Sequence, residues 1–141
     1  MPINKLKILS GLLAAFFIFS GCREIYTKIY NEKEAKKPIS CLNIESDNLV
    51  IEYVVKNRPF IKKLLKKECP YLLKITSNYV TSCSSAQAKA LGSDFDGFVR
   101  FEILKDNDLI YRNQRDFKGT FDNFVADSLI DRMRKDLNFK E

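Results

Sequence analysis

Alternation of apolar and polar residues predicts four β-strands along this chain. The second covers residues 71–80, and the third and fourth, over 95–104 and 109–117, are joined by the tight turn KDND and form an antiparallel hairpin. The first lies within residues 42–55, where the stretch NLVIEYVV would place alternate side chains on one face: Leu49, Ile51, Tyr53 and Val55.

Two other segments repeat their apolar residues every three or four positions, which is typical of amphipathic helices. The first covers 57–69, with Asn57 as N-cap and Pro59 in the first turn, and should run for about three turns. The second follows the N-cap Thr120 and buries an apolar face formed by Phe121, Phe124, Val125, Leu129, Met133 and Leu137.

The predicted order of elements is therefore β-α-β-β-β-α. Strands grouped with two amphipathic helices favour an α+β fold, in which a four-stranded, mostly antiparallel sheet carries both helices on one face. Residues 40–141 are long enough for one such domain, and we expect no second one.

The start of the chain has the layout of a secretory signal peptide over residues 1–21. A short basic segment precedes the uncharged apolar residues 8–19, which are too few for a membrane-spanning helix of about 20 residues. The following IFSGC resembles a bacterial lipobox, which implies cleavage after Gly21 and lipid on the Cys22 sulfur. A plain signal peptide with an incidental cysteine is the alternative.

Residues 22–39 are mostly polar and charged, and we interpret them as a tether between the lipid and the domain. Two or three acyl chains would hold the protein stably on a membrane. Arg23 follows the cysteine, where Asp often marks inner-membrane retention, so we expect the periplasmic face of the outer membrane.

Charge adds little to this picture. The chain has 24 basic and 18 acidic residues, and loss of the signal with its two lysines leaves 22 against 18, a net charge of +4. In an exported protein this excess favours acidic envelope components such as anionic lipid over nucleic acid. Ordinary surface charge explains it equally well.

Three cysteines remain once Cys22 is assigned to lipid: Cys41, Cys69 and Cys83. They allow at most one internal disulfide. Cys69 and Cys83 flank one predicted strand, whose ends would be far apart, so a bond between them is disfavoured. Cys41 could pair with either, or all three could be thiols. The chain has no His, so a zinc site is not expected.

The residues that usually perform catalysis are also missing. Without His there is no Ser-His or Cys-His pair, and no glycine-rich phosphate-binding motif is present. Asp94 and Asp96 precede a strand, where two such residues more often mark a turn than an acid–base pair. We expect no enzymatic activity, no cofactor and no metal.

Four stretches together resemble the LPS-assembly lipoprotein family, LptE, in its short alphaproteobacterial form. They are CREIYTKIY, LVIEYVVKNRPFIKKLLKK, YLLKI leading into FVRFEILKDNDLIYRNQRDFKG, and FDNFVADSLIDRMRKDL. They cover most of the chain after Gly21, although many family members have Cys-Gly rather than Cys22-Arg23.

The resemblance implies a lipoprotein that sits in the outer-membrane β-barrel LptD, helps it fold and assists delivery of lipopolysaccharide to the cell surface. A domain with polar loops suits the polar lumen of a wide barrel. Basic side chains would meet lipid A phosphates as charge-assisted pairs, and the candidates are Lys89, Arg112, Arg115 and Lys118. Arg112 and Arg115 should lie on opposite faces of their strand.

Other functions fit the same features. The chain could be an auxiliary lipoprotein of a lipid-transporting ABC system, or a periplasmic inhibitor or binding lipoprotein. A structural component of an envelope-spanning secretion machine is a further alternative, although an all-β sandwich would suit that role better.

Overall fold

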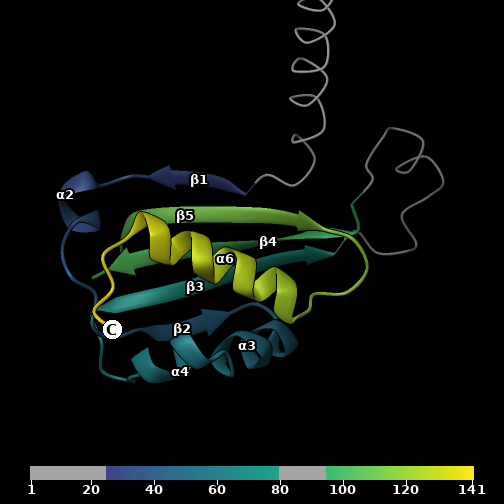
Figure 1. Ribbon diagram of the computed structural model, residues 1–141, viewed down its shortest axis with the longest axis horizontal. Helices are drawn as coiled ribbons and strands as arrows, with labels where there is room; N and C mark the ends of the chain where they lie inside the picture. The colour runs from purple at the N-terminus through teal and green to yellow at the C-terminus, as the bar shows by residue number, and fades with distance from the viewer. Residues whose placement is uncertain (1–24, 80–94) are drawn as a thin grey trace, which may run out of the picture.

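The computed structural model describes residues 25–79 and 95–141. They form a mixed five-stranded sheet in the order β1-β5-β4-β3-β2, with helices packed on it (Figure 1). β2 and β3 are parallel, and the other neighbours are antiparallel. The strands are β1 (Tyr26–Ile29), β2 (Asn43–Ser46), β3 (Tyr71–Tyr79), β4 (Gly97–Lys105) and β5 (Asp108–Phe117).

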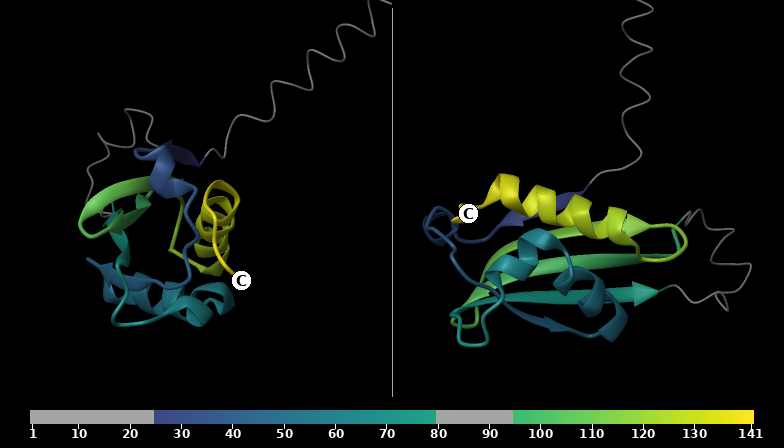
Figure 2. Two further views of the ribbon diagram at one scale, coloured as in Figure 1. Left: turned by 90° about the vertical axis from the view of Figure 1, so that its left-hand side faces the viewer. Right: turned by 60° about the horizontal axis from the view of Figure 1, so that its bottom comes forward.

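The described helices are α2 (Glu32–Ala35), α3 (Leu49–Lys56), α4 (Pro59–Leu64) and α6 (Asn123–Asp136). α6 lies across one face of the sheet, and α3 and α4 cover the same face beside β2 (Figures 1 and 2). The α+β class is therefore confirmed, but the sheet has five strands rather than the four predicted, and more than two helices accompany it.

The predicted hairpin is confirmed. β4 and β5 pair along their whole length, and the turn between them places Asp106 and Asn107 at φ values of 49° and 71°. Asp and Asn tolerate this left-handed conformation better than most residues, which is why a two-residue turn forms here. The pairing shifts register between Ile103 and Leu104, which indicates a β-bulge.

The predicted strand over NLVIEYVV is wrong, because residues 49–56 form α3. The Asn48 side chain caps this helix by accepting hydrogen bonds from the backbone N–H groups of Val50 and Ile51. Ile51 and Val55, four residues apart, are the buried pair. A short apolar stretch fits both periods, and the cap decides for the helix. The strand lies earlier, at β2.

The predicted helix over 57–69 is also shorter than expected. Asn57 is the C-cap of α3 rather than an N-cap, and its Nδ2 donates to the carbonyl oxygen of Tyr53 at 2.8 Å. α4 begins with Pro59 in its first turn, as predicted, and ends at Leu64 because Leu65 is extended and bridges to Leu42.

The last helix is confirmed, with a different start. Its N-cap is Asp122 rather than Thr120. Five of the six predicted face residues are buried, whereas Phe124 is 61% exposed.

The tether predicted over 22–39 is wrong for its described part. β1 pairs with β5, α2 follows, and Ile39 is fully buried and bridges to Phe139. The residues that pair with this segment lie far along the chain, so the local sequence pattern does not reveal the pairing. The predicted signal peptide, with Gly21 and Cys22, lies outside the described residues.

A disulfide joins Cys41 to Cys69, with their Cα atoms 6.0 Å apart. It links the start of β2 to the segment that enters β3, across the α3–α4 connection. This is one of the two pairings that remained open for Cys41. Cys83 lies outside the described residues.

A buried polar network ties α6 to β5. Asn113 is fully buried, and its Nδ2 donates to the carbonyl oxygen of Leu129 at 2.9 Å and to the Tyr111 hydroxyl at 3.3 Å. That hydroxyl donates to Asp136 at 2.8 Å, and Arg132 donates to the same carboxylate. Burial first, and then Asp136, raises the pKa of Tyr111 above its ordinary value.

Candidate functional site: the helix-free face of the sheet

One face of the sheet carries no described helix, and we call it the helix-free face (Figure 2). Residues that are paired across neighbouring strands share a face. The strand register therefore places one charged residue from each strand in a single row, in the order Lys28, Arg112, Glu102, Lys74 and Glu45.

Arg112 is the residue of this row with the most side-chain contacts to its neighbours. Its Nη2 and Nε donate to one Glu102 oxygen at 2.7 and 3.0 Å, and Glu102 is 9% exposed. The hydrogen bond to Glu102 raises the pKa of the Arg112 guanidinium. The Tyr30 ring contacts two cations, with its centroid 5.3 Å from the Arg112 guanidinium carbon and 4.7 Å from Lys28 Nζ. Arg112 is therefore held in place by an acid and a ring.

A second row runs beside the first. Arg100 donates to Gln114 at 3.0 Å and lies 5.4 Å from the Phe98 ring, while Tyr26 pairs with Gln114 on the edge strand. The helix-free face carries four basic residues (Lys28, Lys74, Arg100 and Arg112) and three acidic ones (Glu45, Glu102 and Asp116). Its charges are nearly balanced, which suits contact with another polar surface.

The structure separates the predicted lipopolysaccharide-binding residues. Arg112 lies on the helix-free face, whereas Arg115 lies on the other face, 5.1 Å from the ring of Phe124 in α6. Lys118 is exposed beyond the end of β5, and Lys89 lies outside the described residues. Arg112 and Arg115 therefore lie on opposite faces of the sheet, as the sequence predicted.

Sequence reasoning missed Lys28, Lys74 and Arg100. The period of two in the hairpin puts Arg100 on the face of Arg112, and this signal could have found it. Lys28 could not be found in the same way, because β1 was not recognised as a strand. The Asp96 side chain accepts from the backbone N–H of Gly119 at 2.6 Å, which fits the structural interpretation of this residue.

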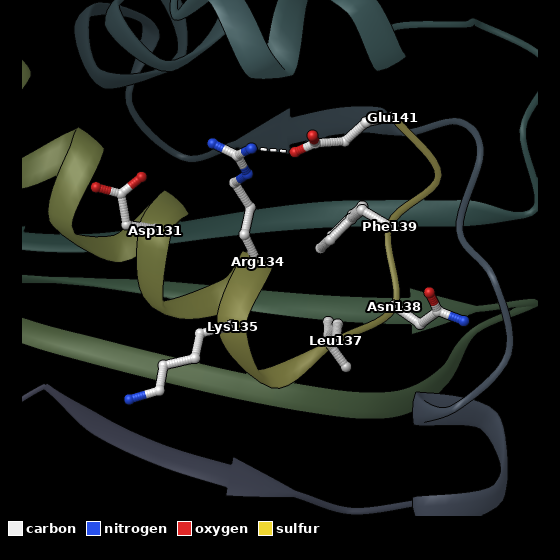
Figure 3. A pocket seen from close by; sticks show the side chains of 7 residues that line it. All are labelled: Asp131, Arg134, Lys135, Leu137, Asn138, Phe139 and Glu141. Carbon is white, nitrogen blue, oxygen red and sulfur yellow. Dashed lines mark hydrogen bonds and ion pairs between the residues drawn. The ribbon is translucent and has the colours of Figure 1, made fainter.

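A pocket of about 340 Å³ lies elsewhere, at the C-terminal end of α6 (Figure 3). Arg134 points toward Glu141, with which it forms an ion pair, and its guanidinium lies 4.3 Å from the Phe60 ring. Asp131 and Lys135 complete an equal number of acids and bases in the lining. Its charges therefore favour neither an anion nor a cation.

Over residues 25–79 and 95–141, no cluster of three metal-ligating side chains occurs. No helix in this part of the chain is long and apolar enough to cross a membrane. Comparison with protein-family models, with curated proteins and with solved structures finds no match to the chain.

Proposed function

We propose that this protein is a non-enzymatic, lipid-anchored assembly factor of the outer membrane, with a role like that of the LPS-assembly lipoproteins. Its helix-free face meets the polar lining of a large β-barrel, and lipid on Cys22 keeps the domain at the periplasmic surface. The barrel then receives lipopolysaccharide.

The observation that supports this proposal most is the charged row across all five strands. A sheet face that meets an apolar partner would be apolar, but this one holds the Arg112–Glu102 ion pair and two cation–aromatic contacts. The lumen of a wide barrel is polar and presents the complementary kind of surface. Lys28 and Lys74 are exposed and could meet lipid A phosphates.

The disulfide gives independent support for the compartment. Bonds such as Cys41–Cys69 persist in oxidising environments, including the bacterial periplasm, and are rare in the cytosol. An exported location agrees with this chemistry, whether or not Cys22 is lipidated.

The test is purification of the tagged, lipidated protein from its own membranes in gentle detergent, with Cys22→Ala beside it. We expect a large β-barrel to co-purify with the tagged protein in a nearly equal molar amount. Lys28→Glu/Lys74→Glu should reduce its recovery, whereas the matched reversal Lys135→Glu/Lys140→Glu, on exposed residues away from this face, should not. Recovery of an inner-membrane transporter component instead would contradict the proposal.

A further inference from the structure

α3 is apolar on both of its sides. Ile51 and Val55 are fully buried against the sheet, whereas Leu49, Val50 and Tyr53 on the opposite side are 81%, 68% and 70% exposed. We call these three residues the α3 ridge. Exposed apolar side chains that gather on one side of a helix often mark a contact surface, and no described residue covers this side of α3.

A group of lysines follows the ridge along the chain. Lys62 and Lys63 lie on α4, and Lys66 and Lys67 lie just after it. All four are exposed, and within the described residues none forms an ion pair. We call them the lysine cluster. Lys56, by contrast, is paired with Glu52.

The composition of this edge favours lipid over protein as its partner. Cores of protein–protein interfaces are depleted in lysine and enriched in arginine. Surfaces that bind membranes combine exposed apolar side chains with lysines, because the apolar groups enter the headgroup boundary while the cations meet anionic lipid. Tyr53 adds a side chain with an apolar body and a polar tip, which suits that boundary.

We propose that the α3 ridge and the lysine cluster form a membrane-surface site for a bilayer that contains anionic lipid. Leu49, Val50 and Tyr53 enter the boundary between headgroups and acyl chains. The lysine cluster meets lipid phosphates beside them. This site is distinct from the helix-free face and does not depend on a barrel partner.

The sheet order makes this site separate from the predicted anchor. α3 lies beside β2, whereas the residues that follow Cys22 lead into β1, and these strands form opposite edges of the sheet. Four strand spacings separate them, or about 19 Å. When the lipid anchor and the α3 ridge contact the same bilayer, the domain lies along the membrane. With the anchor alone, it would stand on its β1 edge.

The chain has no Trp, so Tyr53→Trp introduces a single fluorescent reporter of the ridge. The full lipidated protein is placed in vesicles of phosphatidylcholine with or without phosphatidylglycerol, with bromine on the acyl chains. We expect a blue shift and bromine quenching of the ridge reporter, stronger with the anionic lipid. Phe124→Trp, at an exposed position of α6, is the matched control and should keep water-exposed emission.

Charge reversal tests the lysine cluster. These variants carry the ridge reporter, and each has one lysine of the cluster changed to Glu: Lys62, Lys63, Lys66 or Lys67. Each change should lower the ratio of membrane-docked to undocked protein by about fivefold or more, because one cation near an anionic surface contributes about 1 kcal/mol. Charge reversal of exposed lysines elsewhere should leave the ratio nearly unchanged: Lys33, Lys36, Lys135 and Lys140.

The mass of the purified protein verifies the anchor first, and unanchored protein would be tested by flotation with the same vesicles. Emission of the ridge reporter that stays water-exposed in both vesicles, or shifts no more than that of the α6 control, would overturn the proposal. A blue shift of the ridge reporter that appears only when envelope proteins are added would also overturn the proposal, in favour of a protein partner.

Discussion

Single side chains fix how α6 meets the sheet. Tyr111 and Asn113 come from β5, and Asp136 and the Leu129 carbonyl come from α6, so two hydrogen bonds between buried or half-buried groups set the position of the helix. Asn113 Oδ1 is the buried side-chain atom without a partner in the described residues. These contacts were not predicted, since the sequence shows Asn113 only as one polar residue in an alternating strand.

The raised pKa of Tyr111 predicts alkaline sensitivity. The folded state keeps the phenol protonated above the ordinary tyrosine value of about 10. Between that value and the folded-state pKa, the unfolded chain has lost the proton and the folded chain has kept it, so stability falls as pH rises. Denaturant unfolding at pH 8 and above 10 should show this loss, and Tyr111→Phe should reduce it. An identical pH slope in both proteins would contradict the prediction.

Gly97 is required by close backbone approach. A Cβ atom at this position would lie 2.5 Å from the carbonyl oxygen of Asn78 on the paired strand. Gly97→Ala should therefore lower the free energy of unfolding by about 1–3 kcal/mol, because β3 and β4 must move apart. Thermal unfolding measures this, and a change within error would show that the strands adjust freely.

Among the helices and strands, the sequence predicted correctly those whose stabilising contacts lie within one stretch of chain. The β4–β5 hairpin and α6 followed from alternation, turn residues and an apolar face that are all contained in one stretch of chain. The prediction for α3 failed because six of its eight residues are apolar, so their spacing fits a helix and a strand equally well. The signal that distinguishes the two is the Asn48 cap. β1 failed because its partner β5 lies far along the chain.

The cap of α3 can be tested directly. Asn48→Ala should lower the free energy of unfolding by about 1 kcal/mol, because the N–H groups of Val50 and Ile51 lose their acceptor. Asn48→Asp supplies an oxygen at the same place and should keep most of the stability. Urea unfolding of both variants gives the comparison, and equal losses would indicate that the side-chain cap is not what matters.

At the scale of the whole molecule, the Cys41–Cys69 disulfide closes the loop of chain that contains β2, α3 and α4. The cysteines are 28 residues apart, and a loop of this size predicts stabilisation of about 3–4 kcal/mol. Cys41→Ser/Cys69→Ser should lose that amount in denaturant unfolding. Alkylation and mass measurement before and after reduction establish the bond, and its absence in protein from the periplasm would remove the support it gives to an exported location.

The helix-free face shows how far sequence could reach toward a site. Arg112 was predicted as a functional residue, and Arg100 was within reach from the same hairpin. The row across five strands was not, because it exists only once β1 and β2 take opposite edges of the sheet.

The pairing of the first strand with the last also has a consequence in time. β1 is made early, but its partner β5 ends at Phe117, 88 residues after Ile29. At synthesis rates of about 5–20 residues per second, β1 waits on the order of 4–18 s for that strand. During this interval the segment that follows Cys22 has no sheet to join. The sheet therefore closes only after the last strand has been made, and β1 joins it late.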